Sequence, residues 1–412
     1  MLQYKLHMLQ YQKLACRFFA MLLALTTCGV SAGAPYIAPD EDAKHLTSLG
    51  NIRLWTPEQQ VAAFRNFDLI ADTRTIAAGD SPLQLTEARR DLGPVLIHHD
   101  SGSLTVDEYF KRQSVAGLLV IRDGQVVYER YGLGNSRNTR WVSFSVAKSV
   151  VSMLVGAAIK DGYIAGVEET VTDYLPRLKG SPYEQTTIRH LLQMSSGVLW
   201  NEDYADLKSD INRIPWSALG LTAYVKSLER AHPPGTNFNY NTAETRIIGN
   251  LLRAAIGNNL SFYLTEKIWQ PFGMESDANW ILTGGGGESG GCCISATLRD
   301  YGRLGLFALG DGKLPDGSRV LPEGWMSAST TPSQAFEGYG YFWWLIADGV
   351  YQASGIHGQG IRIDTRQNVV IALHSARAVA SDTEAWALQD ALYASLTEAV
   401  ADQGSDSPAD GH

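Results

Sequence analysis

Alternating apolar and turn-forming residues predict two β-hairpins in opposite halves of the chain. In the first, the apolar runs 116–121 and 126–130 flank Asp123-Gly124, a dipeptide that favours tight hairpin turns. In the second, residues 360–364 and 368–374 form a similar pair, and residues 338–345 are predicted as a further strand. A sheet built from both ends of the chain is therefore expected.

The segment between the two hairpins is predicted to be mainly helical. Small and apolar residues from Ser145 to about Lys160 predict one largely buried helix. Residues 163–290 are predicted as shorter helices and loops, and residues 383–400 as an amphipathic helix. This pattern predicts an α+β fold, with an antiparallel sheet from both chain ends, flanking helices and a helical insertion lobe.

The N-terminus has the order of a secretory signal. Basic residues precede the apolar run 18–25, and small residues follow it. Cleavage near Ala32 and a periplasmic or secreted protein are expected, with lipid attachment at Cys28 as the alternative. No later segment is predicted to span a membrane. The expected organisation is a signal peptide (1–32), a wrapping segment (33–114), a main domain (115–395) and a flexible tail (403–412). Within the main domain we expect a sheet lobe (about 115–160 and 290–395) and a helical lobe (about 161–289).

Composition, charge and the cysteine and histidine residues limit the chemistry expected of the chain. A chain of 412 residues with 45% apolar residues can bury a large core, and its net charge of −9 without a basic cluster argues against nucleic acid as a partner. Cys292 and Cys293 are expected to be separate buried thiols, since adjacent Cα atoms lie closer than most disulfides allow. The pair His98-His99 is predicted to lie in a loop. It lacks a third ligand at helical spacing, so neither a metal nor a cofactor is predicted.

Candidate chemistry is concentrated at the start of the predicted buried helix. Ser145-Val-Ala-Lys148 is the one S-x-x-K tetrad of the chain. Residues three apart share a helix face, so the Lys148 amine can reach the Ser145 hydroxyl. Burial and the positive end of the helix both disfavour a charged ammonium, so Lys148 is predicted to act as a base toward Ser145.

An S-x-x-K tetrad that opens a buried helix after a hairpin resembles the serine β-lactamase and penicillin-binding superfamily. The sequence is most similar to the class C-like branch, which includes 6-aminohexanoate-dimer hydrolases and related esterases. The resemblance extends from about residue 50 to 395. It is carried by residues 120–129, 143–149, 189–197, 234–241, 300–305, 338–341 and 343–344.

The resemblance implies further site residues on the helical lobe. Tyr240 corresponds to the tyrosine that shares protons with the lysine. A substrate contact is implied for Asn241, although the family pattern has its asparagine two residues after the tyrosine, where this chain has Thr242. Tyr204, on the loop after residues 194–197, is implied to line the substrate pocket.

The resemblance also implies a strand beside the nucleophile. Ala353-Ser354-Gly355 stands where the family has Lys-Thr-Gly, so the cation that binds the carboxylate of β-lactams is missing. Ser354 and Gly355 are expected to contact substrate. The amides of Ser145 and Ile356 are expected to form the oxyanion hole. His357 is expected either to bind substrate or to hydrogen-bond within the strand.

The predicted function is an exported serine hydrolase that forms an acyl-enzyme on Ser145 and hydrolyses a small ester or short linear amide. One alternative is a β-lactamase or D-alanyl carboxypeptidase, and another is a non-catalytic cell-wall-binding relative. A third is an α/β-hydrolase, because residues 287–291 match G-x-S-x-G around Ser289. That motif follows a strand in α/β-hydrolases, whereas here a run of glycines precedes it.

Overall fold

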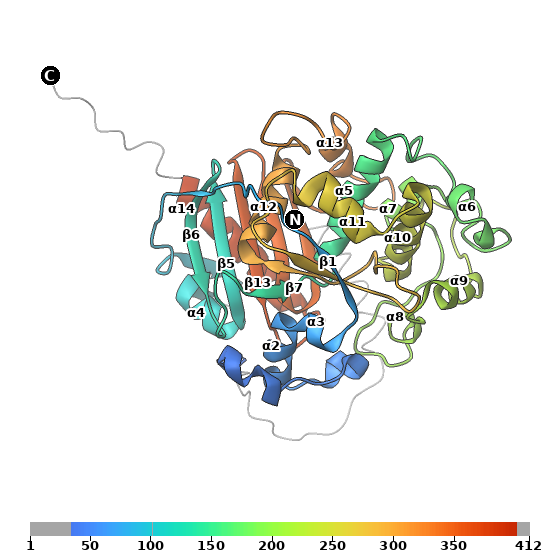
Figure 1. Cartoon of the computed structure of the whole chain (residues 1–412). Coiled ribbons are helices and arrows are strands. Elements are labelled where there is room, and N and C mark those ends of the chain that lie inside the picture. Colours follow the sequence, from blue (N-terminus) through green and yellow to red (C-terminus); the bar gives the residue numbers. More distant parts are fainter. Residues whose placement is uncertain (1–33, 101, 402–412) are drawn as a thin grey trace. The chain divides into compact units, whose positions relative to one another are not determined.

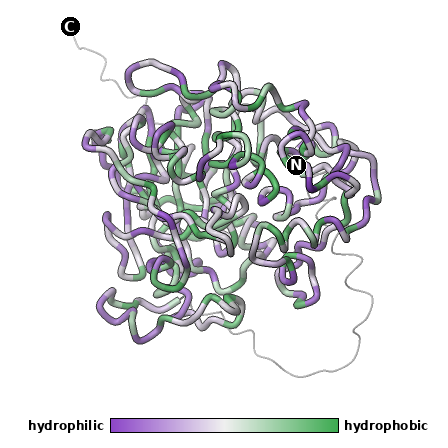
Figure 2. Tube along the Cα trace, turned by 45° about the vertical axis from the view of Figure 1, so that its right-hand side comes forward, coloured by the Kyte–Doolittle hydropathy of each residue, from purple (hydrophilic) through white to green (hydrophobic). Residues whose placement is uncertain are grey.

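The computed structural model describes residues 34–100 and 102–401. The predicted signal peptide with Cys28, and the predicted tail, lie outside the described residues. The described part combines antiparallel sheets with helices, which confirms the predicted α+β fold (Figure 1). Hydrophobic stretches gather in its interior and polar stretches at its surface turns (Figure 2).

The main sheet of the described chain joins strands from both halves of the sequence. Its order is β10-β11-β12-β13-β5-β6-β2, antiparallel except for the pairing of β2 with β6. The strands are β10 (Trp344–Ala347), β11 (Val350–Gly355), β12 (Gln359–Asp364), β13 (Val369–Ser375), β5 (Val115–Arg122), β6 (Gln125–Tyr131) and β2 (Thr86–Glu87). In Figure 1 the teal strands β5 and β6 lie beside the red strand β13.

Two smaller sheets complete the strand inventory of the described residues. One has the order β1-β8-β9-β7 and the other pairs β3 with β4. Their strands are β1 (Thr73–Ile76), β8 (Ala278–Ile281), β9 (Ile294–Thr297), β7 (Arg140–Val142), β3 (Leu96–His99) and β4 (Gly102–Thr105).

The helices cover the main sheet and build the lobe beside it. They are α2 (Pro57–Arg65), α3 (Phe67–Ile70), α4 (Val106–Arg112), α5 (Val146–Lys160), α6 (Val171–Tyr174), α7 (Ile188–Leu192), α8 (Asp210–Arg213), α9 (Ala218–Lys226), α10 (Thr242–Ile256), α11 (Leu260–Leu264), α12 (Leu298–Leu309), α13 (Trp325–Ser329) and α14 (Thr383–Ala401). Short 3-10 segments are η1 (Pro39–Lys44), η2 (Leu49–Leu54), η3 (Pro176–Leu178) and η5 (Ile356–Gly358), and η4 (Thr265–Trp269) is a π-helical turn. No helix of the described residues is both long and apolar enough to cross a membrane.

Period-two alternation in β5 explains why the main sheet is buried on both faces. Leu119 and Ile121 belong to the core that contains α5 and α12, while Leu118 and Val120 pack with the apolar side of α14. Successive strand residues point to opposite faces, so a continuous apolar run serves both layers.

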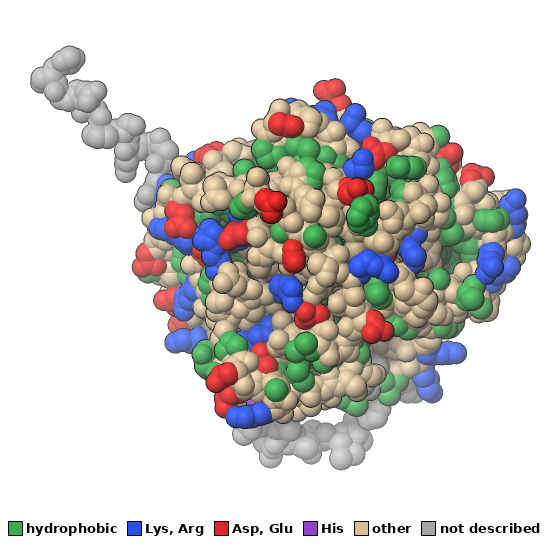
Figure 3. Space-filling view, in the orientation of Figure 1, with side chains coloured by type: hydrophobic (Ala, Val, Ile, Leu, Met, Phe, Trp, Pro, Cys, Tyr) green, Lys and Arg blue, Asp and Glu red, His purple; other side chains and the backbone are tan. Residues whose placement is uncertain are grey.

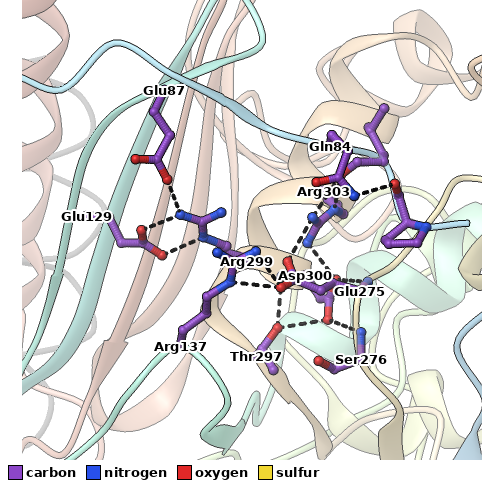
Figure 4. A network of polar contacts seen from close by, with 12 residues as sticks. Gln84, Glu87, Glu129, Arg137, Glu275, Ser276, Thr297, Arg299, Asp300 and Arg303 are labelled. Atoms are coloured by element: carbon purple, nitrogen blue, oxygen red, sulfur yellow. Dashed lines mark hydrogen bonds and ion pairs between the residues drawn. The ribbon is translucent and has the colours of Figure 1, made fainter.

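A polar network fixes the start of α12 beneath this sheet. Arg299 binds Glu129 of β6 through two hydrogen bonds of 2.8 and 2.7 Å and reaches Glu87 of β2 at 2.7 Å (Figure 4). Asp300 accepts the amides of Glu275 and Ser276. The network therefore ties the N-terminal segment, β6 and α12 together.

Three local predictions were wrong. Of the strand predicted over residues 338–345, only Trp344 and Leu345 lie in a strand, β10. The backbone before them is not extended, because Phe342 has a left-handed φ of 59°. His98 and His99 lie in β3 rather than in a loop. The sulfurs of Cys292 and Cys293 are bonded to each other, whereas separate thiols were expected.

Candidate active site

Ser145 lies at a sharp turn between β7 and α5. The preceding residue, Phe144, has a left-handed φ of 45°. A non-glycine residue adopts this conformation at an energetic cost, and such residues are frequent at functional turns. Ser145 is the N-cap residue of α5, yet its hydroxyl makes no capping hydrogen bond. The hydroxyl therefore remains available to another partner.

That partner is Lys148, one helical turn along α5. Its Nζ lies 2.9 Å from Ser145 Oγ and donates to the Gly291 carbonyl at 2.8 Å. The side chain is buried, and burial lowers the pKa of the Lys148 amine to about 8, although the nearby Glu202 carboxylate opposes the shift. A substantial fraction of the amine is therefore neutral near pH 7 to 8 and can accept a proton.

Tyr240 lies beside Ser145, just before α10. Lys148 Nζ lies 5.3 Å from the centre of the Tyr240 ring, and that ring stacks on Trp344 with centroids 5.6 Å apart. Burial and the Glu202 carboxylate raise the pKa of the Tyr240 phenol, and a hydrogen bond with Ser145 opposes this rise. Tyr240 is thus a protonated donor at neutral pH, so Lys148 is the better base of the two.

The Glu202 carboxylate is fixed by donors from two segments of the helical lobe. Its oxygens accept from the Trp200 indole, the Tyr204 hydroxyl at 2.7 Å, and both the amide, at 3.1 Å, and hydroxyl of Thr242. Thr242 follows Tyr240 by two residues. Glu202 therefore holds the loop of Tyr204 against the segment that carries Tyr240.

The end of β11 lies against the turn that carries Ser145. A side-chain carbon at Gly355 would stand 2.4 Å from the Ser143 carbonyl and 3.1 Å from the Ser145 nitrogen, so only glycine fits there. Ser145 precedes α5 and Ile356 begins η5, and N–H groups at such starts have no acceptor within their own helix. The start of η5 therefore lies beside the backbone of Ser145.

The remaining predicted site residues differ in how far they are buried. Asn241 is fully buried, and its carbonyl oxygen accepts the amides of Ala243 and Glu244 as the N-cap of α10. It therefore does not face a substrate. Tyr204 is half-buried beside Glu202, and Ser354 is half-buried at the end of β11. The His357 ring is buried between aromatic side chains.

The surroundings of Ser289 do not fit a nucleophile elbow. Its side chain is 1% exposed, and its hydroxyl has no hydrogen-bond partner among the described residues. The next regular element is the strand β9, whereas the elbow of an α/β-hydrolase leads into a helix. The α/β-hydrolase alternative is therefore wrong.

Neither positive nor negative charge dominates the face of the molecule shown in Figure 3, where acidic and basic side chains are interspersed. Within residues 34–100 and 102–401, no three His, Cys, Asp or Glu side chains are grouped so that they could hold a metal ion.

Comparison with known proteins identifies the family. Residues 105–394 match the family model described as Beta-lactamase. The chain belongs to the β-lactamase family. It is a serine hydrolase of that fold, related to 6-aminohexanoate-dimer hydrolase.

Individual relatives agree with this assignment. The 6-aminohexanoate-dimer hydrolase of Paenarthrobacter ureafaciens is 29% identical over 280 residues, which cover 61% of this chain and 70% of the relative. A Bacillus anthracis structure assigned as a 6-aminohexanoate-dimer hydrolase superposes with a TM-score of 0.76 at 20% identity, covering 86% of this chain and 99% of the other. A family VIII carboxylesterase gives a TM-score of 0.53 at 16% identity, covering 69% and 93%.

Two groups at the site were not predicted from the sequence. The Gly291 carbonyl binds Lys148, but a backbone acceptor has no residue-type signal. Trp344 stacks on Tyr240. In the sequence, the one indication of a role for Trp344 was that residues 343–344 are among those that carry the family resemblance.

Proposed function

We propose that this protein hydrolyses small carboxylic esters or short linear amides through an acyl-enzyme on Ser145. The observation that carries the proposal is the buried contact of 2.9 Å between Lys148 Nζ and Ser145 Oγ. A lysine in this position, with its pKa lowered by burial, can remove the serine proton.

The proposed reaction has two halves. As Ser145 Oγ bonds to the substrate carbonyl carbon, its proton passes to Lys148, and the amides of Ser145 and Ile356 bind the oxyanion. The proton then passes, with Tyr240 as donor, to the alkoxide or amine that leaves. Water then adds to the acyl carbon and gives a proton to the same lysine and tyrosine pair. The bond between that carbon and Ser145 Oγ breaks, the proton passes to Ser145 Oγ and restores its hydroxyl, and the carboxylic acid is released.

The proposed substrate class rests on the strand beside Ser145 and on the relatives. The resemblance places Ala353 where β-lactamases have a lysine, and Ala353 is buried in the main core. Without that cation, the carboxylate of a β-lactam lacks its partner. The names of the 6-aminohexanoate-dimer hydrolase and carboxylesterase relatives support a linear amide or an ester. Export, inferred from the N-terminal sequence, is part of the same proposal.

The test compares three substrate classes with the purified protein. We expect p-nitrophenyl butyrate or 6-aminohexanoate dimer to be hydrolysed with a kcat/KM at least tenfold above that for nitrocefin. Ser145→Ala should abolish the activity, while the matched control Ser289→Ala should retain it. Nitrocefin turnover equal to the best ester would overturn the substrate class. Full activity of Ser145→Ala would overturn the mechanism, and no turnover of any substrate by a folded protein would favour a non-catalytic relative.

A further inference from the structure

The turn that carries Ile356 is held by a residue outside the proposed catalytic set. Residues Ile356–Gly358 form η5 between β11 and β12, and His357 in its centre has φ 61° and ψ 14°. Because of this left-handed conformation, the chain turns sharply at the residue that follows the proposed oxyanion amide of Ile356. The direction of the Ile356 N–H therefore depends on how His357 is fixed.

Three hydrogen bonds fix His357 to the segment after β13. Its amide donates to the Ala380 carbonyl at 2.9 Å, and its carbonyl accepts the Arg377 amide at 3.2 Å. The third bond comes from the side chain, because Nδ1 lies 2.7 Å from the Arg377 carbonyl oxygen. A carbonyl can only accept, so Nδ1 carries the hydrogen. The two backbone bonds can form with other residues at this position, whereas the third requires a side-chain donor.

The same ring packs against the residue that precedes the nucleophile. Its centroid lies 5.3 Å from that of Phe144 and 5.2 Å from that of Phe64, and the two phenyl rings are 5.0 Å apart. Phe144 adopts the strained turn that presents the Ser145 amide. One imidazole thus contacts Phe144 directly and holds the turn of Ile356 through Arg377.

The imidazole does not take part in the chemistry. It is 2% exposed, and Nε2 has no hydrogen-bond partner among the described residues. Burial lowers the pKa of His357 to about 4, so the ring is neutral at neutral pH. A group enclosed in this way cannot reach a substrate, and its influence must pass through the backbone.

We propose that His357 is a positioning residue of the oxyanion hole, which aligns the amides of Ile356 and Ser145 by bonding Arg377 and packing on Phe144. The inference rests on the proposed function, and it assigns His357 neither of the catalytic tasks of proton transfer and nucleophilic attack. An aligned pair of amides binds the tetrahedral intermediate more tightly than the substrate, so losing alignment should lower kcat rather than raise KM.

The experiment compares His357→Ala with His374→Ala. His374 of β13 is a second buried histidine, packed against Trp141 and Tyr301 and absent from the proposed site. With p-nitrophenyl butyrate we expect kcat of His357→Ala to fall by about 10²-fold, the loss typical of one oxyanion donor, with KM nearly unchanged. Affinity for an alkyl boronic acid, whose Ser145 adduct is tetrahedral, should fall in parallel. His374→Ala should lower Tm but keep the wild-type kcat.

Each other result contradicts the inference. A folded His357→Ala enzyme with kcat within threefold of wild type would overturn it, as would a raised KM at unchanged kcat, which indicates direct substrate binding. If the alanine variant does not fold, His357→Asn and His357→Gln take its place. Asparagine tolerates a left-handed φ and sets an amide N–H near the position of Nδ1, so it should exceed glutamine at least tenfold in kcat, and equal values would refute the inference. Failure of the proposed function itself is distinct, because wild type would then show no Ser145-dependent hydrolysis.

Discussion

Replacing Glu202 by glutamine should shift the acid limb of the pH–rate profile to lower pH. The Glu202 carboxylate is the neighbour that stabilises protonated Lys148, while burial favours the neutral amine. Removing the negative charge should therefore lower the pKa of Lys148 below about 8 and keep the base neutral in more acidic solution. Glutamine can preserve the local contacts. Its oxygen can accept from the Trp200 indole and the Thr242 amide, and its NH₂ can donate to the hydroxyls of Tyr204 and Thr242.

The magnitude follows from the wild-type titration. With a pKa of about 8, only about 1% of Lys148 is neutral at pH 6, so wild-type kcat/KM should be about a hundredfold below its plateau there. In Glu202→Gln the ratio of activity at pH 6 to the plateau should rise. The assay is kcat/KM for p-nitrophenyl butyrate from pH 5.5 to 9, with exposed Glu168 replaced by glutamine as the control. A flat wild-type profile would refute the neutral-lysine base, and an unmoved limb in Glu202→Gln alone would refute the coupling to Glu202.

Three further predictions concern the base, the network beneath the sheet and acid stability. Lys148→Arg should lose nearly all kcat while remaining folded, because guanidinium stays protonated; activity above a few per cent would remove Lys148 from the base role. Arg299→Met should lower the free energy of unfolding in urea by about 3 kcal/mol, because buried Glu129 loses its bidentate partner. Arg137→Met, which removes an exposed guanidinium paired with half-buried Glu275, should cost less than about 1 kcal/mol, and equal costs would refute the buried-network argument. Burial lowers the pKa of His374 to about 3, below the unfolded value of about 6.5. The stability of the fold due to neutral His374 is therefore fully present above pH 6.5 and declines toward pH 3, by about 2 kcal/mol at pH 5. His374→Phe should lessen the fall in Tm between about pH 7 and pH 5, and an unchanged fall would contradict this.

Much of the fold could be predicted because local patterns and tertiary structure agree. The apolar run of α5 and the turn at Asp123-Gly124 specify their elements without help from distant residues. The same helix sets Ser145 and Lys148 on one face, so their contact followed from spacing alone. The prediction of a strand over residues 338–343 was wrong. The left-handed turn at Phe342 and the close approach of Gly340 to the Ser329 carbonyl depend on tertiary packing, which local sequence does not specify.

The rest of the site depends on contacts between distant segments. Asn241 is used as a helix cap in the fully buried start of α10, and nothing in the order of residues distinguishes that role from a substrate contact. The Gly291 carbonyl and the enclosure of His357 by Phe64 and Phe144 likewise arise only when separate segments meet. Backbone acceptors and packing partners carry no periodic signal in the sequence.

The central claim is that Ser145 becomes acylated. The most direct measurement is to incubate the protein with a fluorophosphonate probe, digest it and locate the adduct by mass spectrometry. We expect a single adduct on the peptide that contains Ser145, with no labelling in Ser145→Ala and unchanged labelling in Ser289→Ala. Prior incubation with the best ester substrate should slow the labelling. An adduct on another serine, or equal labelling of Ser145→Ala, would contradict the account.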